Sequence, residues 1–360
     1  MPFLNFRGLK GDYMARWMSL IILAFLIIGS LLWFRPDPPF QENEIRGAID
    51  IGSGTSNLKV AKVNPKTNKI ISIIFEKTVP VGYQKQLEQS TTNEFNPQIM
   101  QEGIASIKSL KDLAVQHGAK KVVAIATAAF RQAANSQPFA KEIEKQTGVE
   151  VRVIDQDEEG ILAFRGALAL TPVKPEEAIV WDIGGGSMQF TTLSKQGTYL
   201  IEHGKLASIP FRNAIIQNIE GKDLNTVSSP NPIDSATMDS ALDFARQKAL
   251  ETDQFFKDKF LQEGIQVLAV GNLFNLGIHP LIDKDPVVNQ KTMRQDELME
   301  ALNNLKDRSD EQLIDYSMPE VAVSNPLLVM GYMQGLDINQ IEFIKVNNAD
   351  GALTYPAYWE

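Results

Sequence analysis

Two short segments of the chain combine an aspartate with a glycine-rich turn. In both, an apolar strand-like stretch ends in Asp-Ile-Gly, and a second apolar stretch follows the turn. The glycines let a backbone approach a ligand closely, and turn N–H groups with neighbouring hydroxyls can surround phosphate oxygens. Each aspartate could hold a hydrated Mg²⁺ that balances phosphate charge. The residues are Asp50 with Gly52, Ser53, Gly54 and Thr55, and Asp182 with Gly184, Gly185, Gly186 and Ser187.

The spacing of the two segments supports a ligand site. A single turn of this kind is more commonly a tight β-hairpin that binds nothing. Asp50 and Asp182, however, lie about 130 residues apart, which is the length of one domain. Two matched hairpins at domain spacing predict two similar lobes with a phosphate site in the cleft between them.

Two further segments carry residues suited to phosphate chemistry. Thr127 ends a predicted strand and Arg131 follows it, and a guanidinium can contact phosphate in bidentate fashion. The alternative is a surface arginine at a helix start. Asp157, Glu158 and Glu159 precede an apolar helix, where the helix dipole favours acids in any case. The functional hypothesis is that one of them activates water as a general base.

The order of predicted elements is that of an α/β protein. Val- and Ile-rich stretches alternate with helical patterns bounded by proline and glycine. The expected strands are 45–51, 69–75, 121–127, 149–154, 178–183, 188–193, 198–203 and 340–346. The expected helices are 97–117, 136–147, 157–170, 235–262 and 325–336.

An uncharged stretch precedes these elements, Trp17–Phe34. Its 18 residues, at about 1.5 Å each in a helix, reach across the hydrocarbon layer of a bilayer. A cleaved signal peptide and a buried core helix are the alternatives, but no small-residue cleavage site follows. Arg7, Lys10 and Arg16 precede the stretch, and only Arg35 follows closely. This bias predicts a single-pass anchor in the inner (cytoplasmic) membrane with the globular part in the periplasm.

Composition excludes several classes of function. The net charge of −9 argues against a nucleic-acid partner, because such proteins neutralise phosphates with Lys and Arg. The chain has no cysteine, so disulfides, thiolate zinc sites and cysteine nucleophiles are excluded. Its three histidines are widely separated, which disfavours a histidine zinc site.

Taken together, the motif segments resemble the exopolyphosphatase / guanosine pentaphosphate phosphohydrolase (Ppx/GppA) family of the actin-like ATPase superfamily. The resemblance extends over residues 46–353, including Asp350-Gly351-Ala352-Leu353 near the end. It implies two actin-like (ribonuclease H-like) lobes and Mg²⁺-dependent release of terminal phosphate from polyphosphate or guanosine pentaphosphate. By motif, Glu159 corresponds to the catalytic base, Asp50 and Asp182 to metal-site acids, and Thr127, Arg131 and both turns to phosphate contacts.

Three departures from the family pattern leave alternatives open. Ser187 is followed by Met188-Gln189 where the family has Thr-Glu, so a carboxylate is replaced by an amide. Gly271 is followed by Asn272-Leu273-Phe274 in place of a Gly-Gly-Thr-type turn, and no C-terminal helical domain follows. One alternative is a catalytically weak phosphate or nucleotide sensor of the same fold. Another is a sugar kinase or ATPase, which would need a Gly-Gly turn near Gly271.

The predicted organisation is an anchor and linker at 1–45, one lobe at 46–170 and a second at 171–360. The sequence does not rank the phosphoanhydride substrates. It leaves the oligomeric state open, with a homodimer as one option.

Overall fold

The computed structural model describes residues 43–282 and 291–359, and Asn43–Glu360 form one compact unit. The predicted anchor, Trp17–Phe34, lies outside the described residues. Within those residues, no helix is both long and apolar enough to cross a membrane.

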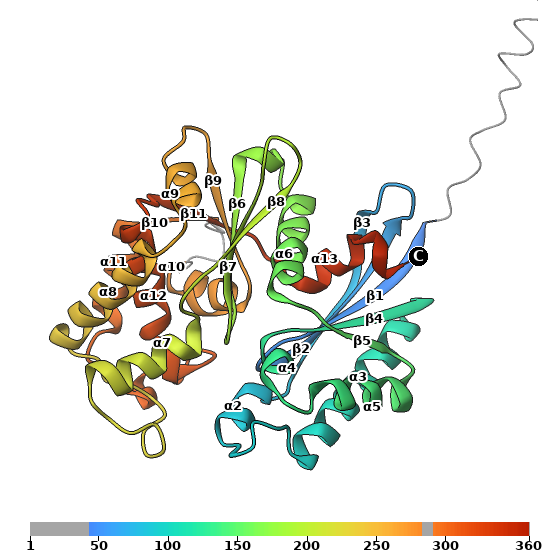
Figure 1. Cartoon of the computed structure of the whole chain (residues 1–360), viewed down its shortest axis with the longest axis horizontal. Helices are drawn as coiled ribbons and strands as arrows, with labels where there is room; N and C mark the ends of the chain where they lie inside the picture. Colours follow the sequence, from blue (N-terminus) through green and yellow to red (C-terminus); the bar gives the residue numbers. More distant parts are fainter. Residues whose placement is uncertain (1–42, 283–290, 360) are drawn as a thin grey trace, which may run out of the picture. The chain divides into compact units, whose positions relative to one another are not determined.

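The first sheet has five strands (Figure 1). In spatial order they are β3 (Lys69–Pro80), β2 (Thr55–Asn64), β1 (Glu44–Ile51), β4 (Lys121–Ala126) and β5 (Glu150–Val153). The first three strands in the chain form an antiparallel meander, and β4 and β5 run parallel to β1. The last six residues of β1 are all buried, because helices cover both faces of the sheet.

The second sheet repeats this arrangement with one strand added. In spatial order it contains β10 (Thr292–Arg294), β11 (Gln340–Phe343), β9 (Gln266–Val270), β6 (Ala178–Ile183), β7 (Met188–Leu193) and β8 (Tyr199–His203). Here β6, β7 and β8 form the antiparallel meander. Strand β9 runs parallel to β6, and β11 runs parallel to β9. The predicted α/β class is confirmed. Strands β9 and β10 were not predicted.

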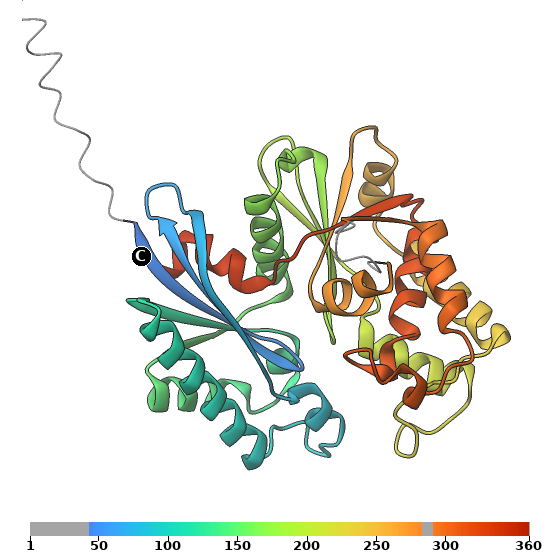
Figure 2. The same ribbon diagram turned by 180° about the vertical axis from the view of Figure 1, so that it is seen from behind.

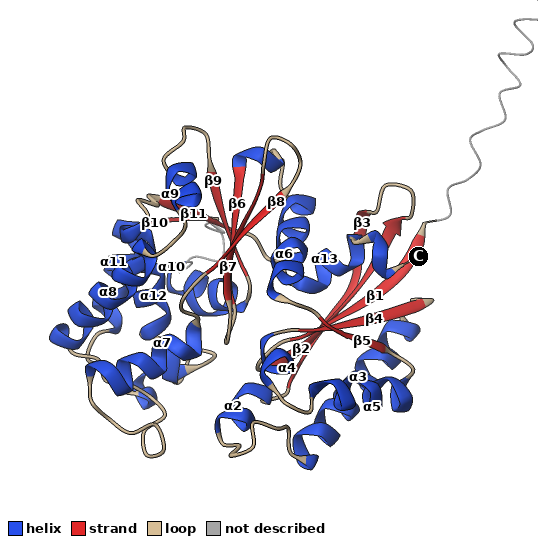
Figure 3. Ribbon diagram, viewed as in Figure 1, coloured by secondary structure: helices blue, strands red, loops and turns tan. Residues whose placement is uncertain are grey.

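Helices between the strands cover the sheets (Figure 3). Those in the first half are α2 (Tyr83–Glu88), α3 (Pro97–Gln116), α4 (Ala128–Gln132), α5 (Ser136–Thr147) and α6 (Gln156–Leu170). Helix α3 begins as predicted: Pro97 occupies its first turn, and the Asn96 side chain accepts the N–H of Ile99 at 2.9 Å. Buried side chains of α3 and α5, such as Leu110 and Phe139, pack on one face of the first sheet.

The second half is richer in helices, as predicted. They are α7 (Ser208–Ala214), α8 (Ser235–Leu250), α9 (Gln254–Phe260), α10 (His279–Ile282), α11 (Gln295–Leu305), α12 (Ser324–Gly335) and α13 (Asn348–Thr354). Short 3-10 and π turns complete the chain: η1 (Pro175–Glu177), η2 (Ile215–Ile219), η3 (Leu273–Ile278), η4 (Asp310–Leu313), η5 (Pro319–Val321) and η6 (Pro356–Tyr358). The single helix predicted at 235–262 is wrong. It is two helices, because Asp253 caps the start of α9 through the N–H of Phe255.

Helices α6 and α13 cross between the two sheets. Residues of α6 such as Phe164 pack on β6 and β9 of the second sheet. Leu353 of α13 packs on β1 and β4 of the first sheet. The predicted boundary at 170/171 assigns α6 to the first lobe and α13 to the second, so the core packing does not follow it for these two helices.

The crossing depends on glycine. A Cβ atom at Gly351 would overlap the backbone carbonyl of Leu162, and one at Gly166 would lie 3.2 Å from the N atom of Gly351. The two helix backbones can therefore approach only while both positions lack a side chain.

We expect Gly351→Ala to lower the free energy of unfolding by about 1–3 kcal/mol, because the added methyl group must push α6 and α13 apart. Urea denaturation measures this. Gly82→Ala is the control, since the nearest atom to its new Cβ would be Lys85 Cβ at 3.8 Å. Equal midpoints for the two variants would show that the crossing tolerates a side chain.

Candidate functional site

The two glycine-rich turns have the same backbone geometry. The N–H of Gly52 donates to the carbonyl oxygen of Thr55 at 2.9 Å, and that of Gly184 to Ser187 at 2.9 Å. Asp50 and Asp182 stand at equivalent places, one residue before the end of β1 and of β6. The repeat expected from the sequence is therefore present in three dimensions.

The turns present N–H groups that the protein itself does not use. The carbonyl oxygens of Ser53 and Gly54 accept N–H groups from residues 84 and 81, at 2.9 and 3.0 Å. Those of Gly184 and Gly185 accept from residues 208 and 209, at 3.3 and 2.9 Å. Among the described residues, the N–H groups of Ser53, Gly54, Gly185 and Gly186 have no hydrogen-bond acceptor. Such free amides are suited to an anion.

The turns lie against each other. A Cβ atom at Gly185 would stand 3.2 Å from Ser53 Cβ, and one at Gly186 would stand 3.2 Å from Ala128 Cβ at the start of α4. The amide Nδ2 of Asn272 donates to Thr55 Oγ1 at 3.4 Å, which is a second link between the two sheets. Both predicted phosphate turns therefore contribute to a single site.

Gly271, which follows β9, also borders this site. Its φ of +90° lies in the left-handed region, and a Cβ atom there would meet Asp182 Oδ1 at 2.5 Å. A side chain at this position would displace the aspartate.

The start of α6 separates the two adjacent glutamates. Asp155 caps the helix by accepting the N–H of Glu158 at 2.8 Å. The carboxylate of Glu158 accepts the hydroxyl of Tyr358 at 2.6 Å. The side chain of Glu159 is 5% exposed and points to the second turn, where it accepts the Ser187 hydroxyl. As expected from the 100° between successive helical residues, only one of the pair faces the turns.

Glu159 lies between the second turn and Arg131. Its Oε2 is 2.7 Å from Arg131 Nη2, and it accepts the Ser187 hydroxyl at 3.3 Å. Arg131 also donates from Nη1 to the carbonyl of Ile154 at 3.2 Å, which fixes the guanidinium. Thr127 lies one turn before Arg131 and is buried. Its N–H donates a hydrogen bond to the carbonyl oxygen of Ile51 at 3.1 Å. The predicted base, arginine and turns are therefore brought together.

Three buried carboxylates share this site, and burial is the largest cause of the raised pKa of each. Burial, followed by the charge of Glu159, raises the pKa of Asp50 to about 7. Burial, followed by the charges of Glu159 and Asp50, raises the pKa of Asp182 well above its usual range. Burial also raises the pKa of Glu159, although Arg131 opposes this. The cluster therefore has more negative charge than its one guanidinium balances.

Gln189 and Gln156 extend the hydrogen bonding around Asp182. Gln189 is fully buried opposite Asp182 in the β6–β7 ladder, and its Nε2 donates to Asp182 Oδ2 at 3.1 Å. Gln156 Nε2 donates to Gln189 Oε1 at 3.0 Å. The sequence analysis missed Gln156. Its only signal was a position three residues before Glu159, on the same face of α6.

The donors in this cluster fit a Mg²⁺ ion that keeps part of its coordination for water and substrate. They are carboxylate oxygens, which Mg²⁺ prefers, and Asp50 Oδ1 is buried without a hydrogen-bond partner in the described part of the chain. Among residues 43–282 and 291–359, no group of three or more His, Cys, Asp or Glu could hold a metal ion. Mg²⁺ commonly uses one or two carboxylates, water and substrate phosphate, so this arrangement remains compatible with it.

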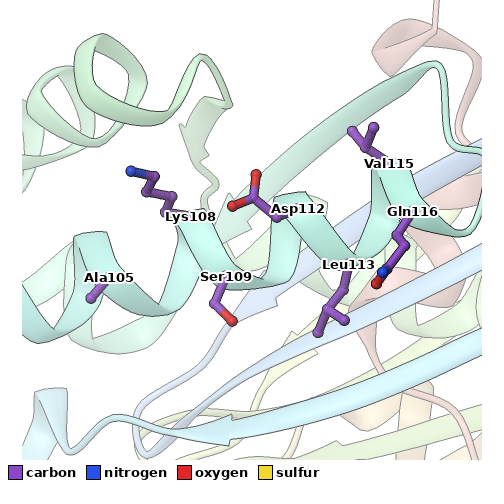
Figure 4. A pocket seen from close by; sticks show the side chains of 7 residues that line it. All are labelled: Ala105, Lys108, Ser109, Asp112, Leu113, Val115 and Gln116. Atoms are coloured by element: carbon purple, nitrogen blue, oxygen red, sulfur yellow. The ribbon is translucent and has the colours of Figure 1, made fainter.

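A hollow elsewhere on the molecule is separate from these residues. It measures about 680 Å³ and lies along α3 (Figure 4). Seven residues of that helix line it, from Ala105 to Gln116, and none of them belongs to the predicted site.

Known proteins resemble this chain in sequence. The Ppx/GppA phosphatase family matches residues 60–210, a range that contains Arg131, Glu159 and the second turn. The chain is 26% identical over 162 residues to a bifunctional 3-dehydroquinate synthase/phosphatase of Fusobacterium nucleatum, covering 44% of this chain and 24% of the relative. It is 25% identical over 151 residues to exopolyphosphatase 1 of Mycobacterium bovis, covering 41% of each. The chain thus spans less than half the length of these curated relatives.

Solved structures resemble it over a greater length. A PPX-GPPA enzyme of Aquifex aeolicus superimposes with a TM-score of 0.67 at 18% identity, covering 86% of this chain and 99% of the other. An exopolyphosphatase of Cytophaga hutchinsonii gives 0.67 at 17% identity, covering 86% and 96%. The predicted resemblance and the two-lobed α/β fold are confirmed.

Proposed function

We propose that the chain, whose residues 60–210 match the Ppx/GppA phosphatase family, hydrolyses the terminal phosphoanhydride bond of inorganic polyphosphate or guanosine pentaphosphate. One observation carries the proposal. A buried glutamate, Glu159, contacts both the hydroxyl of the second phosphate turn and Arg131, next to turn amides that have no acceptor among the described residues.

In this proposal the turn amides and Arg131 bind the terminal phosphoryl group. Arg131 then shares its guanidinium between phosphate oxygens and Glu159. Glu159 takes a proton from water, the water oxygen attacks phosphorus, and the shortened phosphate chain leaves with the electrons of the broken P–O bond. The amides stabilise charge on the transferring group without reorganising, because the turn hydrogen bonds already fix them.

Asp50 and Asp182 would hold Mg²⁺ at this site. The ion would neutralise charge on the phosphoryl oxygens. The two aspartates sit on equivalent strand ends behind the turns, and Asp50 has a free buried oxygen in the described part of the chain.

Phosphate release tests the proposal. The purified chain, with Mg²⁺, is offered long-chain polyphosphate, tripolyphosphate, guanosine pentaphosphate and ATP. We expect release from polyphosphate or guanosine pentaphosphate to exceed release from ATP. Absence of release from all four substrates would overturn the assignment.

A second candidate function is a phosphate or nucleotide sensor that binds without turnover. It is favoured by Gln189, whose amide occupies Asp182 Oδ2, an oxygen that a metal ion would otherwise contact. Tight binding of the same ligands, measured by calorimetry, without phosphate release would identify this function.

We expect Gln189→Glu to increase the stabilisation of the protein by Mg²⁺. The new carboxylate would face Asp182 and add negative charge to a buried cluster that already has an excess. A ligand that binds only the folded state raises the melting temperature according to its affinity. Thermal unfolding in EDTA and in Mg²⁺ therefore measures the change. An Mg²⁺-induced shift equal to that of the unchanged protein would place the metal elsewhere.

We also propose that residues 17–34 anchor the chain in the inner membrane with the globular part in the periplasm. The asymmetry of Lys and Arg around that segment supports this orientation. A periplasm-dependent phosphatase reporter fused at the C-terminus should be active. A reporter that works only in the cytoplasm should be active instead if the orientation is reversed.

A further inference from the structure

The hairpin of β2 and β3 carries an exposed surface that the proposed hydrolase does not use. This surface, the β2–β3 tip, comprises residues 62–74. It contains no Asp or Glu, although the chain as a whole has a net charge of −9. Three lysines on it are exposed, Lys62, Lys66 and Lys69. Among the described residues, none of the three forms an ion pair.

Apolar side chains accompany the lysines. Ile71, Ile73 and Ile74 are 51%, 39% and 40% exposed, although they lie within four residues of one another. Single exposed apolar residues are ordinary, whereas a cluster beside unpaired positive charge is typical of surfaces that contact a partner.

The tip is held at the end of the sheet where the described chain begins. Glu44 pairs with Val63 in the β1–β2 ladder, and Arg46 Nη1 donates to Asn68 Oδ1 at 2.9 Å. Figures 1 and 2 both show the β2–β3 turn beside the start of β1. Residues 35–43 connect the predicted anchor to β1 and can extend over at most about 30 Å. The tip is therefore within reach of a bilayer that holds the anchor.

Strand β3 is an edge strand, so a second copy of the chain is the competing partner. The ladder disfavours it. The pairing of β3 with β2 skips Ile71 and Ile74, which are extra residues in two β-bulges. Bulges interrupt the regular edge that another strand would need. A lipid surface requires no hydrogen-bond register, and it offers anionic headgroups to lysine and an acyl boundary to isoleucine.

We propose that the β2–β3 tip binds an anionic lipid surface and orients the globular unit on the membrane. This proposal rests on the proposed anchor at residues 17–34, but it is independent of the hydrolase assignment, because no residue of the tip belongs to the catalytic site.

Single-cysteine labelling of the full chain tests it, and the absence of native cysteine removes any background. A polarity-sensitive fluorophore is placed at Ile73→Cys or, as the matched control, at Ile314→Cys, an isoleucine that is 71% exposed. Each protein is combined with vesicles containing phosphatidylglycerol and a spin-labelled quencher lipid. We expect the label at 73 to shift to the blue and lose at least half its intensity, with little change at 314. Equal quenching at both positions overturns the proposal.

Charge reversal separates the lipid from other partners. Lys62→Glu, Lys66→Glu and Lys69→Glu together should abolish the quenching at position 73. Reversal of three lysines on α3 and α5 (Lys108, Lys141 and Lys145) should leave it unchanged. Shielding of the label at 73 without lipid, in proportion to protein concentration, would assign the tip to a second copy and overturn the lipid proposal.

Discussion

Replacing Glu159 by Gln should lower turnover by about 10²–10⁴-fold while substrate affinity changes little. The amide keeps the shape of the side chain and can still accept the Ser187 hydroxyl, but it cannot take a proton from water. Steady-state phosphate release gives kcat, and calorimetry on the inactive variant gives affinity. A melting curve confirms that the buried site stays folded after Arg131 loses its ionic partner.

Glu158→Gln is the matched control. Glu158 neighbours Glu159 in the same first turn of α6, but it accepts the Tyr358 hydroxyl and does not contact the turns. Its replacement should cost about 0.3–1 kcal/mol of stability through the helix terminus and leave turnover nearly unchanged. Equal activity of the two variants, or a loss of binding alone in Glu159→Gln, would remove Glu159 from the role of base and favour the sensor.

Asp182→Asn should move activity and stability in opposite directions. We expect turnover to fall about 10²-fold or more, because a carboxylate that would hold Mg²⁺ is lost. We expect the melting temperature without metal to rise, because burial and the charges of Glu159 and Asp50 already disfavour the ionised form of Asp182. Gains in stability at the expense of activity are typical of functional residues.

Asp350→Asn provides the contrast. Asp350 is also a buried aspartate, but its Oδ2 lies 2.7 Å from Lys59 Nζ. Removing its charge leaves the buried Lys59 with Glu76 Oε2, at 3.9 Å, as its remaining ion pair among the described residues, so this variant should be less stable by about 3–5 kcal/mol. If Asp182→Asn also lowers the melting temperature, the role of Asp182 is structural.

The sequence alone determined the parts of the site that depend on local structure. Glycine, serine and aspartate at a strand end specify a turn through their own backbone preferences, and Asn96-Pro97 specify a helix start. The strands 178–183 and 188–193 and the helix 136–147 were predicted to the residue, because the β-branched and aromatic residues of the strands and the glycine that ends the helix are local signals.

Only the tertiary structure decided which of these parts meet. Glu159 pairs with Arg131, 28 residues earlier in the chain, because the strands that precede them, β4 and β5, lie side by side and parallel in the first sheet. The backbone approach of α6 and α13 at Gly351 has no local signature, since it depends on space that a distant helix must occupy. Gln156 joined the site for the same reason: a glutamine has many possible partners, and packing selected Gln189. Turn chemistry is encoded within a few residues, whereas the balance of charge around Asp182 depends on residues that only folding brings together.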